Sequence, residues 1–72
     1  MNVLNKIEEL RKCRGITQVK LAEDLNVSRQ TINAIEKHKY NPSLELSLKI
    51  SEYFDVKVEE LFKLVTKGEV KR

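Results

Sequence analysis

Two short amphipathic helices are predicted near the middle of the chain, separated by a turn at residues 26–28. Apolar residues at helical spacing mark the inward face of each helix. These are Leu21, Ala22 and Leu25 in the first helix and Ile32 and Ile35 in the second. Ser28 can cap the second helix, and Val27 and Ile32 occupy the positions of a hydrophobic staple. The pattern therefore predicts two helices joined by a tight turn over residues 17–36.

Three further helices are expected around this pair. Asn5 and Glu8 have the spacing of a capping box, which predicts a helix over residues 6–14 that ends at Gly15. Pro42 and Ser43 predict the start of a helix over residues 44–54. Its inward stripe is expected to be Leu44, Ser47, Leu48, Ser51 and Phe54, with Ile50 at the border and Leu46 and Tyr53 outside. A short fifth helix is expected over residues 58–62.

The two ends of the chain leave alternatives open. Residues 2–4 and 63–65 are suited to pair as a small two-strand ribbon, and the alternative is an irregular tail over residues 64–72. The expected fold is thus a compact all-α arrangement of five helices, with or without this ribbon. A length of 72 residues predicts one domain, residues 1–72.

Composition narrows the class of protein only slightly. The net charge is +3, and residues 1–42 carry eight Lys or Arg against five Asp or Glu, whereas residues 43–72 carry six of each. The excess positive charge therefore lies in the half with the paired helices, which is compatible with nucleic-acid binding. A chain this small buries a limited core, so dimerisation would help to stabilise it.

Several classes of function are disfavoured by what the sequence lacks. Its single cysteine, Cys13, cannot form an intrachain disulfide, and no apolar run predicts a membrane span or a signal peptide. We therefore expect a soluble cytoplasmic protein. His38 and Cys13 alone cannot complete a zinc site, and no nucleophile–base pair or phosphate-binding glycine loop is present. No metal, cofactor or enzymatic activity is expected.

The outward face of the second paired helix carries the candidate chemistry. Arg29 can donate two hydrogen bonds to guanine, and Gln30 and Asn33 can each bond adenine through both amide atoms. Thr31 and Ala34 add methyl groups suited to a thymine methyl. Gln18 begins the first paired helix, where its side chain and the helix N-terminus can both meet a phosphate. The residues alone leave two alternatives open, recognition of base edges in a DNA major groove and a merely solvated polar face.

This segment closely resembles the helix-turn-helix of phage Cro and repressor proteins, the xenobiotic-response-element-like regulators. The matching residues are Thr17-Gln18, Leu21-Ala22, Val27-Ser28, Thr31-Ile32, Glu36, Asn41-Pro42-Ser43-Leu44, Lys49-Ile50 and Glu60-Leu61-Phe62. Three positions differ from the family's usual sequence pattern. Asn26 and His38 replace common glycines, and Lys57 replaces a capping Ser or Thr. Asn tolerates the left-handed conformation, but His38 is expected to make the end of its helix less regular.

The resemblance implies further roles. It assigns DNA-backbone contacts to Ser28 and to the loop Lys37, His38, Lys39, Tyr40 and Asn41, and a partly buried structural ion pair to Arg11 and Glu36. It also implies a homodimer, for which the candidate interface residues are Tyr53, Val58, Leu61 and Leu64, although Leu61 and Val58 are alternatively core residues.

The leading functional prediction is a prokaryotic transcription regulator, most simply a repressor that binds an inverted-repeat operator in double-stranded DNA as a homodimer. The rival class is an antitoxin-like or adaptor module that uses the same fold to bind another protein. No small-molecule ligand or membrane partner is expected. An outward row of Arg29, Gln30 and Asn33 favours the DNA-binding class, because an adaptor has no need of it.

Overall fold

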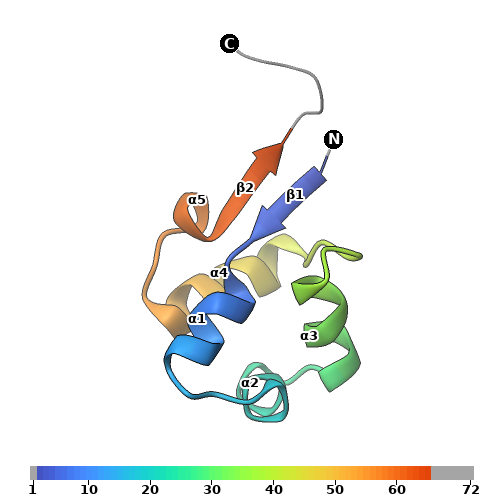
Figure 1. Ribbon diagram of the computed structural model, residues 1–72, viewed down its shortest axis with the longest axis vertical. Coiled ribbons are helices and arrows are strands. Elements are labelled where there is room, and N and C mark those ends of the chain that lie inside the picture. Colours follow the sequence, from blue (N-terminus) through green and yellow to red (C-terminus); the bar gives the residue numbers. More distant parts are fainter. Residues whose placement is uncertain (1, 66–72) are drawn as a thin grey trace.

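A computed structural model describes residues 2–65 of the chain. Over these residues five helices pack around a shared core, and the two ends of the chain form a ribbon that projects from it (Figure 1). The helices are α1 (Ile7–Cys13), α2 (Gln18–Leu25), α3 (Arg29–Glu36), α4 (Leu44–Phe54) and α5 (Val58–Leu61). The strands are β1 (Asn2–Asn5) and β2 (Phe62–Val65). The expected five-helix fold is confirmed, and of the two alternatives for the chain ends the structure has the ribbon.

Side-chain caps begin three of the helices where the sequence predicts them. The hydroxyl oxygens of Thr17, Ser28 and Ser43 accept hydrogen bonds from backbone N–H groups three residues further on, at 3.0, 3.1 and 3.1 Å. Each bond satisfies a donor that the helix itself cannot pair. These caps explain why α2, α3 and α4 start at the expected residues.

The start of α1 differs from the expected capping box. The helix begins at Ile7, whose N–H donates to the side-chain oxygen of Asn5 at 3.1 Å, while Glu8 pairs with Lys12. Asn5 is held in β1, and its amide nitrogen donates to the carbonyl of Ile35 at 2.9 Å. Asn5 therefore joins the ribbon to the ends of both α1 and α3 instead of completing a local capping box.

Four helices end in the same way, in a residue with left-handed backbone conformation. These residues are Gly15, Asn26, His38 and Asp55, with φ of 68, 59, 62 and 57°. In each case the next residue donates its N–H to the carbonyl five residues back, at 2.9 to 3.1 Å, which is the Schellman pattern. The expectation of an irregular end at His38 is therefore wrong, because this hydrogen-bond pattern holds His38 in the left-handed region.

The core draws on every helix. Its buried apolar members are Ile7, Leu21, Ala22, Leu25, Ile32, Ile35, Leu46, Ile50, Phe54 and Leu61. The stripe expected on α4 is wrong at its leucines, since Leu44 and Leu48 are 74% and 53% exposed whereas Leu46 and Ile50 are buried. Ser47 and Phe54 are buried as expected. Leucines occupy two faces of α4, so periodicity alone could not decide between them. Packing against the other helices selects the face with Leu46, Ile50 and Phe54.

The ribbon is antiparallel and pairs the two ends of the described chain. Its register joins Asn2 to Val65, Val3 to Leu64, Leu4 to Lys63 and Asn5 to Phe62. A further backbone hydrogen bond, from Lys6 to Leu61 at 3.1 Å, links its base to α5. The irregular tail considered over residues 64–72 is therefore replaced by a strand up to Val65, and residues 66–72 lie outside the described part.

A buried ion pair connects α1 to α3. Arg11 donates to the two carboxylate oxygens of Glu36 from Nε at 2.7 Å and from Nη2 at 3.1 Å. Its third bond, from Nη1, goes to the carbonyl of Ile16 at 2.9 Å. The side chains are 10% and 1% exposed, so the charges lie almost entirely out of water. Such a bidentate pair fixes the last turn of α3 against α1.

We expect Glu36→Gln to lower the free energy of unfolding by about 3–5 kcal/mol, because it leaves the Arg11 charge buried without a counter-charge. Urea unfolding followed by circular dichroism measures this loss. Glu8→Gln is the matched control, since it removes the same charge from an exposed pair with Lys12 and should leave the unfolding midpoint nearly unchanged. Equal effects of the two substitutions would contradict a special role for the buried pair.

Candidate nucleic-acid interface

The helix α3 has one buried and one exposed side. Ile32, Ile35 and Glu36 face the core, whereas Arg29, Gln30 and Asn33 are exposed. Figure 1 shows α3 along one flank of the molecule, next to α2. The hydrophobic anchors thus hold α3 rigidly while its polar side chains remain on the surface. The structure thus places Arg29, Gln30 and Asn33, which the sequence predicts for base recognition, on the exposed side of α3.

The two short residues of that predicted set are placed differently. Thr31 and Ala34 are half-buried, not fully exposed. The hydroxyl of Thr31 also lies 2.9 Å from the hydroxyl of Ser28, which in turn accepts a hydrogen bond from the Thr31 N–H. The Ser28 and Thr31 hydroxyls are therefore already engaged in the cap of α3. Only the methyl group of Thr31 then remains free of this cap for contact with a partner.

The first turn of α3 carries most of the exposed hydrogen-bonding capacity. Arg29 and Gln30 occupy its first two positions, directly after the cap at Ser28. A guanidinium offers five donors in a planar fork, and an amide offers both donors and acceptors. In helix-turn-helix proteins the first residues of the second helix reach the base edges. The geometry is thus suited to contacts in a groove about as wide as one helix.

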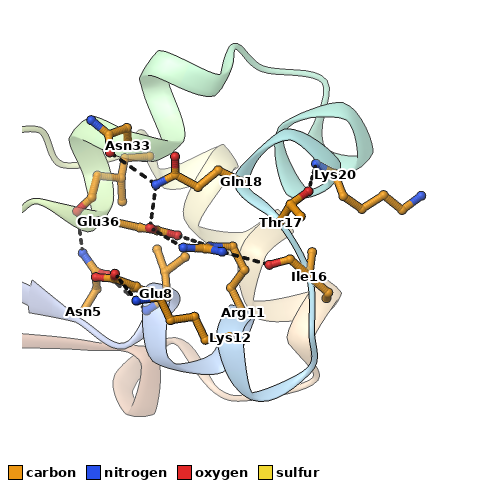
Figure 2. A network of polar contacts seen from close by, with 12 residues as sticks. Asn5, Glu8, Arg11, Lys12, Ile16, Thr17, Gln18, Lys20, Asn33 and Glu36 are labelled. Atoms are coloured by element: carbon orange, nitrogen blue, oxygen red, sulfur yellow. Dashed lines mark hydrogen bonds and ion pairs between the residues drawn. The ribbon is translucent and has the colours of Figure 1, made fainter.

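Gln18 is built into a network that sequence reasoning missed. Its amide nitrogen donates to Oε1 of Glu36 at 2.9 Å and to Oδ1 of Asn33 at 3.3 Å. Figure 2 shows Gln18 between the buried ion pair and Asn33. The sequence offered no direct signal for these contacts, because the three residues lie 15 and 18 positions apart. Only the packing of α2 against α3 brings them together.

The loop after α3 is basic and exposed. Its residues are Lys37, His38, Lys39, Tyr40 and Asn41. The hydrogen bond from the Lys39 N–H to the carbonyl of Ala34, 3.0 Å long, fixes the start of the loop on the end of α3. The two lysines therefore lie close to the exposed face of α3, where a phosphate backbone would pass beside base-contacting residues.

The four residues predicted for a dimer interface differ in how far they are exposed. Leu61 is 1% exposed and belongs to the core, so its assignment to the interface is corrected. Val58 and Tyr53 are half-buried, whereas Leu64 in β2 is 62% exposed. The alternative recognised for Leu61 therefore holds, and Leu64 is the most accessible of the candidates.

Tyr53 has a structural partner within the chain. Its hydroxyl donates to Oδ2 of Asp24 at 2.6 Å, which joins α4 to the end of α2. This hydrogen bond, with a second contact from Lys20, lowers the pKa of Asp24, and the same bond raises the pKa of Tyr53. The contact helps to hold the helix-turn-helix on α4, so Tyr53 is only partly available to another molecule.

Other kinds of site are not built by the described residues. Across residues 2–65 no group of three or more His, Cys, Asp or Glu side chains is arranged to hold a metal ion. Cys13 is exposed and unpaired with another cysteine in this part of the chain. None of the helices found there has the length and apolar character needed to cross a membrane.

Comparison with known proteins agrees with this geometry. The profile of a helix-turn-helix family matches residues 7–61. An uncharacterized HTH-type transcriptional regulator of Methanocaldococcus jannaschii is 53% identical over 58 residues, which make up 81% of this chain and 88% of that protein. The immunity repressor protein of Bacillus phage phi105 is 50% identical over 44 residues, which make up 61% of this chain but 31% of that protein.

A solved structure shows the same architecture. The restriction-modification controller protein C.AhdI from Aeromonas hydrophila superposes with a TM-score of 0.69 at 29% sequence identity, over 76% of this chain and 83% of that chain. The residues matched by the family profile, 7–61, include the whole helix-turn-helix, from α2 to α3. The chain belongs to the Cro/CI-type helix-turn-helix family of DNA-binding transcriptional regulators, which are not enzymes.

Proposed function

We propose that this regulator is a repressor that binds an inverted-repeat operator in double-stranded DNA as a homodimer. The observation that carries the proposal is the exposed polar face of α3, with Arg29, Gln30 and Asn33 outward and Ile32 and Ile35 anchored in the core. The outward side chains match the donor and acceptor patterns of base edges in the major groove. The same residues would have no evident purpose on a surface that only meets water.

A second set of residues is proposed to hold the DNA backbone. Lys37 and Lys39 would neutralise phosphates, which would make binding depend strongly on salt. The other members of this set are Gln18, Ser28, Tyr40 and Asn41. Such contacts fix the position of the protein on the duplex without reading its sequence. Base specificity and general affinity should therefore be separable by mutation.

Repression fits a regulator of this design. A dimer that places two α3 helices about 34 Å apart, one turn of DNA, would fit the two halves of an inverted repeat. Occupying such a site would block a promoter. The proposed location of the protein is the cytoplasm. In this proposal residues 1–72 form a single DNA-binding domain. The relationship to a phage immunity repressor supports this role.

A second candidate function is a protein-interaction module, such as an antitoxin-like partner or an adaptor. One observation favours it: Leu44 and Leu48 are exposed on the same side of α4, four residues apart. An exposed apolar pair of this kind can bind another protein. Binding titrations with DNA separate the two functions, because an interaction module would show no preference among duplexes.

We expect Arg29→Ala to weaken binding to the preferred duplex by roughly 1–3 kcal/mol and to relax the preference at one base pair in each half-site. Lys39→Ala should weaken all duplexes about equally and reduce the salt dependence. Titrations of both variants against preferred and scrambled duplexes at several salt concentrations measure these effects. Base readout by Arg29 would be wrong if Arg29→Ala left the preference unchanged.

We also expect a symmetric dimer that uses Val58 and Leu64, together with the accessible part of Tyr53. Sedimentation equilibrium at tens of micromolar should show the dimer, and Leu64→Glu should shift it toward monomer. Leu48→Glu is the matched control, because it places the same charge on an exposed leucine of α4 that is not among the proposed interface residues. A monomer with and without DNA would rule out the proposed assembly.

A further inference from the structure

We propose that Gln18 is a positioning residue that holds the amide of Asn33 in one of its two orientations, with the nitrogen toward DNA. This inference rests on the proposed function, since it concerns how α3 selects a base. It assigns Gln18 a role in specificity in addition to a contact with phosphate. The juxtaposition that carries it is the chain of contacts from Glu36 through Gln18 to Asn33.

The first step is fixed by a buried charge. The Glu36 side chain is 1% exposed and its carboxylate accepts two hydrogen bonds from Arg11. An ionised carboxylate can only accept hydrogen bonds. The Gln18 side chain must therefore turn its nitrogen, not its oxygen, toward Glu36, where the separation is 2.9 Å. The opposite orientation would place an amide oxygen against a carboxylate oxygen, without a proton between them.

In the second step, the orientation of the Gln18 amide determines the orientation of the Asn33 amide at the surface. The Gln18 amide nitrogen has two hydrogens, one for Glu36 and one for Asn33. Because this nitrogen can only donate, the Asn33 atom that faces it at 3.3 Å must be the oxygen. A half-turn of the Asn33 amide would bring two donors together. Figure 2 shows the resulting arrangement, with the Asn33 amide nitrogen pointing away from Gln18.

The consequence is a defined chemical preference. With its oxygen held by Gln18, Asn33 presents hydrogen-bond donors outward, so it should favour base edges that offer an acceptor. In the major groove these are N7 and O6 of guanine, N7 of adenine and O4 of thymine, whereas cytosine offers the N4 donor. The Asn33 oxygen keeps a second lone pair, so the bidentate contact with adenine stays a prediction, and the inference adds which amide atom is turned away from Gln18.

The test combines selection of bound DNA from random duplexes with binding titrations. Comparing wild type with Asn33→Ala identifies the base pair that Asn33 contacts. Gln18→Met is the main variant, because it keeps the length of the side chain but donates no hydrogen bond. Gln18→Lys is the rescue variant, since its ammonium can donate to both oxygens. Gln30→Ala is the control for an exposed α3 amide outside the network.

Wild type should favour an acceptor-bearing base over cytosine at that position, by roughly 3- to 10-fold, the worth of a single net hydrogen bond. Gln18→Met should remove most of this ratio, because the Asn33 amide becomes free to turn over. Gln18→Lys should keep the ratio while raising affinity for all duplexes. Gln30→Ala should change the preference only at another base pair. Circular dichroism of each variant should show an unchanged helical spectrum, since Arg11 still pairs with Glu36.

Two results would overturn the inference while leaving the proposed function in place. One is a Gln18→Met protein that loses affinity equally for all duplexes and keeps the wild-type ratio at the Asn33 position. The other is an Asn33→Ala protein with an unaltered base preference at every position. A wild-type protein that shows no preference among duplexes would instead overturn the proposed function, and the inference with it.

Discussion

The buried pair of Arg11 and Glu36 is the interaction on which the rest of the helix-turn-helix depends. It joins the first helix to the last turn of α3 with two charge-assisted hydrogen bonds, in a place almost without water. Buried ion pairs are weak contributors to net stability, but removing one partner is strongly destabilising. The main effect of this pair is therefore to fix positions within the fold. It forces α1 and α3 into one relative position, and it places a fixed acceptor at the point where α2 begins.

The orientation of side chains on the candidate recognition surface depends on the Glu36 carboxylate. Capping hydroxyls set where α2 and α3 start, and apolar anchors set the face that α3 buries. These features place the exposed side chains but do not orient their amides. The hydrogen bonds from Gln18 to Glu36 and Asn33 supply that orientation. A charge inside the protein can thus determine whether a side chain at the surface offers a donor or an acceptor.

Much of this fold could be predicted from the sequence because its signals are local. Thr17, Ser28 and Ser43 mark helix starts, and the apolar spacing of α2 and α3 identifies their buried faces. The failures arose where distant contacts decide the outcome. The buried face of α4 was misassigned because leucines lie on two of its faces. Asn5 was assigned to a local capping box, but it also bonds the end of α3, 30 residues away. Most of the predicted DNA-contacting residues lie on α3 and the following loop, whereas Gln18 lies on α2 and its hydrogen bonds join residues with no common sequence pattern.

A neutron crystal structure of the protein bound to a duplex selected from random DNA tests the central claim most directly, because it distinguishes the two amide atoms of Asn33. We expect α3 in the major groove, with Nδ2 of Asn33 within hydrogen-bond distance of a base acceptor and Oδ1 still bonded to Gln18. A complex in which Oδ1 of Asn33 faces the bases, or in which α3 lies outside the groove, would contradict this expectation.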